Sequence, residues 1–384
     1  MIRDAQQTGG KPVDPTLSMP ESRIRVIAYY LPQFHPIPEN DAWWGKGFTE
    51  WTNVTKAQPL FRGHEQPKLP SDLGFYDLRV PEVREQQAEL ARQYGIEGFC
   101  YWHYWFNGKR LLNRPLDEVR ASGRPDFPFC VGWANESWTR RMTGEENELL
   151  LEQTYSPEDD LAHARWLAEL FADPRYIRVK GRPLFILYRA PFLPEPQRTT
   201  DTIRAESVRL GLPEPFIVGR DTHTPYRDLR PFGVDITEYA APAHGSLGNV
   251  LAPVGARNLI RNLRHGILAR VKLYDYEKAC EYMERDRPKH PHIRCFFVGW
   301  DNTARRGKKA VIFTNATPDA FARRLRVVVE SMRNEPDEHR ILMINAWNEW
   351  AEGMALEPSR LYGHRFLEAL QSEVSRPLSS PATY

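Results

Sequence analysis

Short apolar runs alternate along the chain with longer segments whose apolar residues recur at helical spacing. Continuous apolar runs of this length are typical of strands that a parallel sheet buries on both faces. The runs predict eight strands: Arg25–Tyr30, Gly98–Trp105, Phe127–Gly132, Pro183–Tyr188, Phe216–Gly219, Val234–Tyr239, Arg294–Val298 and Ile341–Ile344. The segments between and after them predict helices at Val80–Tyr94, Leu116–Ala121, Pro157–Ala172, Thr200–Leu210, Tyr276–Arg285, Asp319–Met332 and Leu361–Val374.

Eight strand–helix units in succession predict an α/β fold, a (β/α)₈ TIM barrel. The barrel forms one catalytic domain over residues 23–375, with a disordered tail at 1–22 and a short C-terminal tail at 376–384. The alternative is an open doubly wound sheet, as in many sugar-nucleotide glycosyltransferases. The chain has no glycine-rich turn after the first strand and no DxD motif at a strand end, so the barrel is favoured.

Two long connections interrupt the regular alternation. The segment after the first strand runs to about Leu78, is rich in proline and aromatic residues, and is predicted to lack secondary structure of its own. Loops of this length are more often functional than idle. The second connection is an irregular insertion after the sixth strand, Gly245–Tyr274, which holds the basic stretch Arg257–Lys272.

Composition narrows the class of partner. The 384 residues carry a formal net charge of +2, so no nucleic acid partner is expected. No run reaches the roughly 20 apolar residues that a membrane span requires, and the N-terminus lacks the apolar core of a signal peptide. We therefore expect a cytoplasmic protein, with a peripheral membrane contact left open. The four cysteines have no metal-binding spacing, and we expect neither a metal nor a cofactor.

Polar and aromatic side chains gather where the predicted strands end. The active sites of TIM barrels lie at this end of the strands. Amides, carboxylates, histidines and aromatic rings suit the hydroxyl groups and apolar faces of sugars, whereas a phosphate site would hold more glycine and lysine. Each residue alone is more often structural, so the argument rests on their coincidence. The predicted glycan-binding residues are Tyr30, Gln33, His35, Trp102, His103, Tyr104, Trp133, Asn135, Glu136, Tyr188, Glu238, Trp300, Asp301, Trp347 and Asn348.

The last strand leads into NAWNEWAEG, which places Glu349 and Glu352 three residues apart between tryptophans. Breaking or making a glycosidic bond needs one carboxyl group to protonate the leaving oxygen and a second to act as base or nucleophile. We predict these two as the catalytic residues. The alternative is that both are solvated loop charges. The Asn–Glu pair recurs at Asn135–Glu136, so Glu136 and Glu238 are kept as sugar-binding or partner carboxylates.

Four motifs together resemble the WbsX-like proteins, which are related to glycoside hydrolase family 99: YYLPQFHPIPENDAWWGKGFTEWTNV, GFCYWHYWF, VGWANESW and NAWNEWAEG. The resemblance covers roughly Arg25 to Leu370 and implies a TIM barrel. Members are described as glycosyltransferases or as proteins of lipopolysaccharide and O-antigen biosynthesis, and the family 99 hydrolases are endo-acting, retaining α-mannosidases and mannanases. It implies that Glu349 is a base that deprotonates the sugar 2-hydroxyl, giving a 1,2-anhydro sugar, and that Glu352 is the acid.

Two departures from the family 99 pattern put mannose specificity in doubt: the segment Tyr29–His35 and Ala351. Three functions are therefore weighed. The first is an enzyme that acts on the glycosidic bonds of a bacterial-type poly- or oligosaccharide. The second is a glycosyltransferase of O-antigen, lipopolysaccharide or capsule assembly, which requires a nucleotide- or lipid-phosphate-binding element such as Arg257–Lys272. The third is a non-catalytic glycan-binding protein, whose function Glu349→Gln would leave intact.

Overall fold

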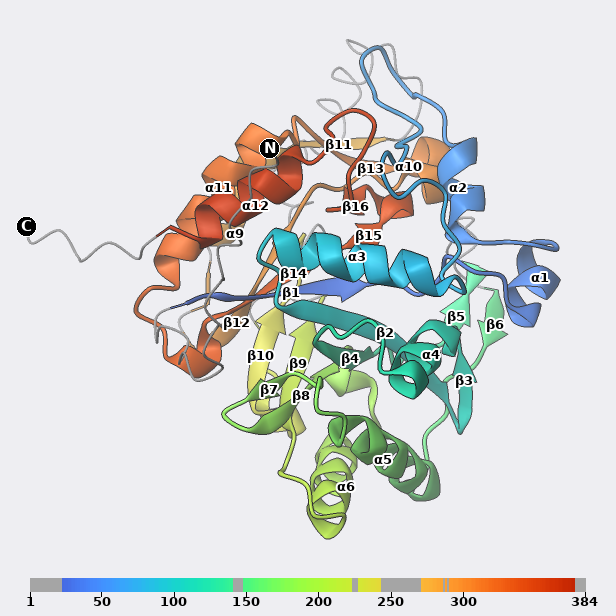
Figure 1. The fold of residues 1–384 in the computed structure, drawn as a ribbon, viewed down its shortest axis with the longest axis vertical. Helices are drawn as coiled ribbons and strands as arrows, with labels where there is room; N and C mark the ends of the chain where they lie inside the picture. The colour runs from blue at the N-terminus through green and yellow to red at the C-terminus, as the bar shows by residue number, and fades with distance from the viewer. Residues whose placement is uncertain are drawn as a thin grey trace, which may run out of the picture.

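The central feature of the fold is a closed barrel of parallel strands (Figure 1). The computed structural model describes residues 23–140, 148–222, 227–242, 271–285, 287–288 and 290–376. Around the barrel the order is β1-β14-β12-β10-β9-β8-β4-β2, and β2 pairs with β1 to close the ring. The predicted TIM barrel is confirmed. Its strands are β1 (Arg25–Tyr30), β2 (Gly98–Phe106), β4 (Phe129–Trp133), β8 (Arg182–Leu187), β9 (Phe216–Asp221), β10 (Ile236–Tyr239), β12 (His292–Phe297) and β14 (Ile341–Asn345).

The barrel strands are apolar because both of their faces are covered. In β14 every residue is buried, and Leu342 and Ile344 lie opposite Val26 and Ala28 of β1. Side chains of one set point into the barrel, and those of the other set meet the surrounding helices. The main core therefore runs without a break from the barrel interior to the helix layer.

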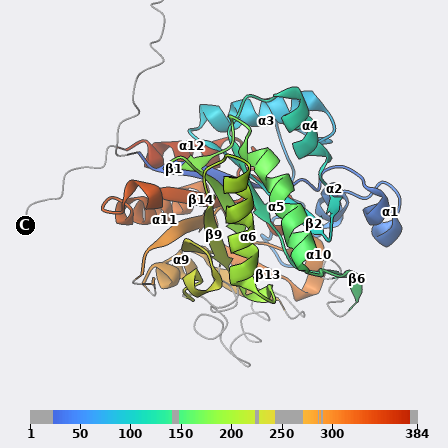
Figure 2. The same cartoon turned by 90° about the horizontal axis from the view of Figure 1, so that it is seen from below.

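Helices cover the outside of the barrel, and Figure 2 shows α5 and α6 packed side by side along it. Ser156 and Thr317 cap α5 and α11 by accepting hydrogen bonds from Asp159 N and Ala320 N. The last helix begins four residues later than predicted because the chain turns at Gly363, where φ is +53°. The helices of this layer are α3 (Pro81–Gln93), α4 (Arg114–Ser122), α5 (Pro157–Phe171), α6 (Pro196–Arg209), α9 (Tyr276–Arg285), α11 (Pro318–Ser331) and α12 (Arg365–Val374).

The loop after β1 contains two short helices, α1 (Pro38–Trp44) and α2 (Glu50–Lys56), so the prediction of a loop without secondary structure is wrong. A capping box between Thr49 and Thr52 starts α2, and Trp51 and Val54 anchor it in the core. Figure 1 shows α2 beside α10 (Thr303–Arg306), close to the hairpin that follows β14, and α2 packs against both. The loop is thereby fixed at one edge of the barrel mouth.

Short strands outside the barrel were also missed, because runs of two to four residues carry little periodic signal. Part of the segment expected to be irregular, Lys272–Asp275, forms β11 and pairs with β13. The additional strands are β3 (Lys109–Leu111), β5 (Trp138–Thr139), β6 (Leu149–Leu151), β7 (Arg178–Val179), β11 (Lys272–Asp275), β13 (Val311–Thr314), β15 (Asn348–Glu349) and β16 (Met354–Ala355).

Several predicted segments lie outside the described residues. They are the tail at 1–22, residues 377–384 of the C-terminal tail, and the basic stretch Arg257–Lys272 up to residue 270. Among the helices of the described ranges, none combines the length and apolar content that a bilayer crossing requires.

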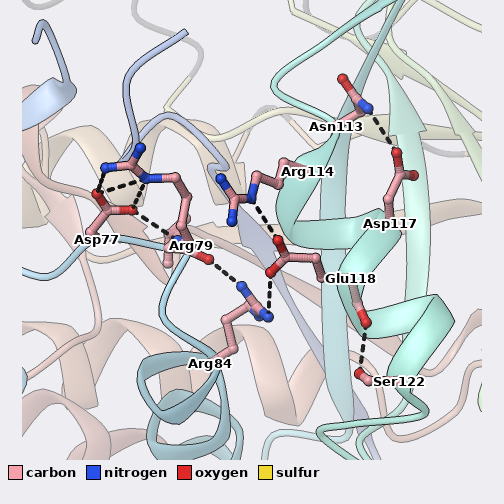
Figure 3. Close-up of polar contacts among 9 residues, drawn as sticks. Asp77, Arg79, Arg84, Asn113, Arg114, Asp117, Glu118 and Ser122 are labelled. Atoms are coloured by element: carbon pink, nitrogen blue, oxygen red, sulfur yellow. Dashed lines mark hydrogen bonds and ion pairs between the residues drawn. The ribbon is translucent and has the colours of Figure 1, made fainter.

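A buried arginine connects α3 to α4 and to the end of the loop that follows β1 (Figure 3). Arg84 on α3 is 3% exposed. Its Nη2 lies 2.8 Å from Glu118 Oε2 on α4, and its Nη1 donates to the carbonyl of Leu78. Arg114, which is half exposed, donates to the other oxygen of Glu118 at 2.6 Å. Arg84 is therefore the buried member of a two-arginine cluster around one carboxylate.

Replacing Arg84 by alanine is expected to lower the free energy of unfolding by roughly 2–4 kcal/mol, because the Leu78 carbonyl and the buried side of Glu118 lose their donor. The matched control is Arg114→Ala, which removes an exposed partner of the same carboxylate and should cost less than about 1 kcal/mol. Urea unfolding of both variants measures the difference. Equal losses would contradict the role given to burial.

Candidate functional site

A pocket of about 560 Å³ opens at the carboxyl ends of the barrel strands. Pockets of this size are typical of small-molecule and glycan sites. Its wall also includes arginines that the sequence analysis did not select, chiefly Arg189, Arg220 and Arg305. The predicted residues that line it are Gln33, Trp102, Tyr104, Glu136, Tyr188, Trp300, Glu349 and Glu352.

The predicted catalytic pair lies on a tight turn after β14. Glu349 ends β15, whose partner β16 brings the chain back five residues later, and a single 3₁₀ turn, Trp350–Glu352, joins them. Gly353 follows with φ +67°, a conformation that favours glycine. The carbonyl of Glu352 accepts a hydrogen bond from Asp301 N at 2.7 Å, which ties the turn to the end of β12. The turn directs both carboxyl groups into the same pocket.

One guanidinium contacts both carboxylates. Arg305 Nη1 lies 2.7 Å from Glu352 Oε1 and 3.6 Å from Glu349 Oε1. These two oxygens are therefore no more than about 6 Å apart, so both carboxyl groups can reach one bound sugar. The other terminal nitrogen, Arg305 Nη2, lies 3.2 Å from a third carboxylate, Glu50 Oε2 on α2.

The charge state of Glu349 is unusual for a carboxylic acid. Burial raises its pKa to about 8, and the neighbouring Glu352 carboxylate adds to the rise, while Arg305 opposes it. Glu349 therefore holds a proton at neutral pH when the pocket is empty of substrate. Groups with pKa values moved toward neutrality are characteristic of acid/base sites.

The two Asn–Glu pairs use asparagine in the same way. Asn348 is fully buried, and its Oδ1 accepts from Leu31 N at 2.7 Å while its Nδ2 donates to Leu31 O at 3.0 Å. Asn135, also fully buried, makes the same two bonds to the backbone of Arg189, at 2.8 and 3.0 Å. Each amide thus pairs with the chain just beyond the neighbouring barrel strand. The prediction that these asparagines contact a sugar is corrected, because the backbone occupies their amide groups.

Glu238, the third carboxylate at a strand end, faces the barrel interior. It is fully buried and paired with Arg220, and it accepts a hydrogen bond from the Tyr29 hydroxyl. The Arg220 guanidinium lies over the Tyr29 ring at 4.2 Å, and Tyr29 stacks on Trp102 at 4.8 Å. Glu238 therefore supports the pocket floor from below, and Arg220 and Trp102 present its upper surface.

Comparison with known proteins was decisive for the family. The family described as "Glycosyltransferase WbsX" matches residues 26–370. The chain belongs to this family. Two curated relatives, both described as "Uncharacterized protein WxcX" and from two strains of Xanthomonas campestris pv. campestris, are 40% identical over 370 residues. That alignment covers 94% of this chain, and the chain spans about half (51%) of the length of these relatives.

Two solved structures of glycoside hydrolase type have a fold similar to that of this WbsX-family chain. A "Glycoside hydrolase-like protein" is similar with a TM-score of 0.59 at 15% identity, over 96% of this chain and 98% of that one. The GH99 endo-alpha-mannosidase of Bacteroides thetaiotaomicron is similar with a TM-score of 0.55 at 13% identity, over 93% and 97% of the two chains. The resemblance to the WbsX family is confirmed, and the fold is that of family 99.

Five predicted binding residues lie behind the pocket of the WbsX-family chain: Tyr30, His35, His103, Trp133 and Trp347. All are nearly or fully buried in the core, so the prediction that they touch substrate is corrected. The Tyr30 hydroxyl donates to Gln87 Oε1 at 2.6 Å, and Trp133 Nε1 donates to the carbonyl of Trp105 at 3.3 Å. For Tyr30, His103 and Trp133 strand alternation explains the burial, because neighbouring residues of a strand point to opposite faces.

The two histidines of this set are uncharged at neutral pH. Burial lowers the pKa of His35 to about 4 and holds the pKa of His103 well below its usual range. His103 packs on the ring of Trp166 at 4.2 Å, and its Nε2 lies 3.1 Å from that of His163. Both histidines are therefore core residues rather than ligands of a sugar.

Asp301 faces a second cavity and acts as an anchor for the loop after β1. Its Oδ2 accepts from Gln66 Nε2 at 2.6 Å and contacts His64 Nε2 at 2.8 Å. Its Oδ1 accepts from the Thr303 hydroxyl and backbone N–H. With these partners the carboxylate is satisfied by protein and lies outside the pocket that holds Glu349, so its predicted role in sugar binding stays a prediction.

Sequence reasoning missed Glu50 and Arg305. Neither follows a barrel strand closely: Glu50 is 20 residues past β1, and Arg305 comes after a turn beyond β12. Arg189 follows β8 and Arg220 is the last residue but one of β9, and this position at strand ends was the signal that could have selected them.

Because the pKa of Glu349 is raised from its ordinary value of 4.5 to about 8, this group destabilises the folded state progressively as pH rises between these values. We expect Glu349→Gln to melt at a higher temperature than the wild type at pH 8–9. The gap should close as pH falls below 4.5, where the wild-type group is protonated in both states. Glu89→Gln, at an exposed position on α3, is the control and should show no pH-dependent gap. Calorimetry across this range checks the sign.

Proposed function

We propose that this WbsX-family chain is a carbohydrate-active enzyme that acts on glycosidic bonds of a poly- or oligosaccharide, with Glu349 and Glu352 as its acid/base pair. The observation that carries the proposal is the geometry of this pair. Two carboxyl groups share Arg305 Nη1 inside an aromatic pocket, and one of them has its pKa raised to about 8.

The proposed chemistry follows the roles that the family 99 resemblance implies. The single proton of the pair moves from Glu349 to Glu352 when substrate binds, so that Glu349 is ionised and Glu352 is protonated. Glu349 then takes the proton of the sugar 2-hydroxyl, whose oxygen attacks C1 as the bond from C1 to the leaving oxygen breaks. Glu352 gives its proton to that leaving oxygen. An incoming hydroxyl then opens the 1,2-anhydro ring at C1, returning one proton to Glu352, while the sugar oxygen recovers its proton from Glu349. The anomeric configuration is retained.

Pocket residues supply binding and orientation in this scheme. Trp102, Tyr188 and Trp300 offer flat apolar surfaces for sugar C–H faces. Glu136 is ion-paired with Arg189 at 3.0 Å at the pocket wall, where both can bind hydroxyl groups. Gln33 Nε2 donates to the Tyr104 hydroxyl at 3.1 Å, and both residues line the pocket.

The family description favours a second candidate, glycosyl transfer. Hydrolysis and transfer differ in the incoming hydroxyl, which belongs to water in the first and to an acceptor sugar in the second. The same carboxyl pair serves both. A nucleotide-sugar transferase would need a phosphate-binding element, and the stretch proposed for it, Arg257–Lys272, lies almost wholly outside the described residues.

The first test is to incubate the protein with bacterial surface polysaccharides and a panel of α-mannans, and to follow new reducing ends and transfer to a labelled acceptor sugar. We expect Glu349→Gln and Glu352→Gln each to lower the rate by about 10²-fold or more, because a general acid or base is lost. Glu89→Gln is the matched control and should keep the wild-type rate. Glycan binding without turnover in the wild type would leave a binding protein, and equal rates in all variants would remove the pair from the mechanism.

The pH dependence tests whether the two carboxyl groups act as an acid/base pair. The pair needs one proton, so we expect kcat/KM to fall as pH rises through about 8, where that proton is lost. Initial rates between pH 5.5 and 9.5 on an active glycan give the profile. A rate that keeps rising through this range would show that turnover needs both carboxyl groups ionised, and would reject the acid/base pair.

A further inference from the structure

A third carboxylate near the catalytic pair has no place in the proposed reaction. Glu50 on α2 is fully buried, and it does not line the pocket. Taking a carboxylate out of water is costly unless a cation accompanies it. The cation that contacts it is Arg305, whose Nη2 lies 3.2 Å from Glu50 Oε2. Glu50 is thus connected to the pocket through one guanidinium.

The arrangement of that guanidinium is directional. A guanidinium is planar and presents its nitrogens in a rigid fork. With Nη2 turned toward Glu50, Nη1 is the nitrogen left to face Glu352 at 2.7 Å and Glu349 at 3.6 Å. The helices α2 and α10 and the turn that carries Glu352 pack directly against one another, so the three partners are held on rigid elements.

We propose that Glu50 is a positioning residue, which orients Arg305 and, through its own negative charge, keeps the catalytic proton on Glu349 until substrate arrives. The proposal rests on the proposed function of Glu349 and Glu352. Glu50 touches neither the pocket nor the reacting atoms, and therefore acts only through Arg305 and through the field at Glu349.

The titratable and charged groups that face Glu349 lie on five elements. Glu352 on its own turn and Glu50 on α2 favour the protonated form, whereas Arg305 on α10 and Arg220 on β9 favour the ionised form. Tyr104 on β2 also lies within range and is uncharged, since burial raises its pKa above the usual range. Burial makes the largest contribution and also favours the protonated form, so the pKa of Glu349 is raised. Removing Glu50 takes away one repulsive charge and leaves Arg305 to the catalytic pair.

A purely structural role for Glu50 makes a different prediction. If it only neutralises Arg305 so that α2 can pack, its loss lowers stability without moving the titration of Glu349. The charge and the shape of Glu50 can be separated, because Glu50→Gln keeps the shape and removes the charge, and Glu50→Asp keeps the charge and shortens the side chain.

The experiment is a ¹³C NMR titration of protein labelled at the glutamate side-chain carboxyl, with the Glu349 signal assigned by its absence in Glu349→Gln. We expect Glu50→Gln to lower the Glu349 midpoint by about one pH unit, Arg305→Gln to raise it, and Glu50→Asp to leave it near the wild-type value. Glu206→Gln is the matched control, since it removes a well-buried carboxylate that pairs with Arg165 and Arg209 far from the pocket. It should leave the midpoint unchanged.

Unchanged midpoints in both Glu50→Gln and Arg305→Gln would overturn the proposal, as would shifts of the same sign. If Glu50→Gln does not fold, Arg305→Gln and Glu50→Asp still decide it: a midpoint that stays constant in Arg305→Gln, or one that moves in Glu50→Asp, rejects the role. The titration needs no substrate, so it can succeed even if no glycan is ever turned over. In an active enzyme, the limb of the kcat/KM profile near pH 8 should move with the NMR midpoint.

Discussion

The structure depends on keeping several carboxylates dry at the mouth of the barrel. Glu50 and Glu238 are fully buried, and Glu349 and Glu352 are largely so. Each such group would raise the free energy of the folded state by several kcal/mol if it were left alone. Two guanidiniums offset this cost, Arg305 for one group of three and Arg220 for Glu238. The apolar barrel buries these carboxylates, and the two arginines offset the free-energy cost of burying their charge.

This balance of charges also explains why a carboxyl group in the pocket keeps a proton near neutral pH. The Arg305 guanidinium contacts three carboxyl groups, so negative charge would exceed positive charge if all three were ionised. A proton on Glu349 removes part of this excess. A site with cations in excess would hold all its carboxylates ionised and would lack a proton to give.

The fold was largely predictable because each barrel strand is a continuous apolar run, and eight such runs leave few alternatives. The place of Glu349 and Glu352 in the pocket was predictable because they follow the last run directly. The direction of side chains was not: Tyr30, His103 and Trp133 belong to strands, and one residue of register separates the pocket from the core. Glu50 and Arg305 were out of reach because their contact joins segments about 250 residues apart, which no local pattern records.

The paired asparagines have a consequence for how such sites are built. Asn135 and Asn348 each continue the hydrogen-bond ladder of the barrel with a side chain after the strand itself has ended. The backbone leaves the ladder at this point, but the asparagine side chain still binds it to the neighbouring segment. The glutamate that follows faces the pocket. In each Asn–Glu pair the asparagine binds the backbone beside it and the glutamate points into the pocket. The same pair could be designed onto another strand of a parallel barrel, to place a carboxyl group at the barrel mouth without adding a loop.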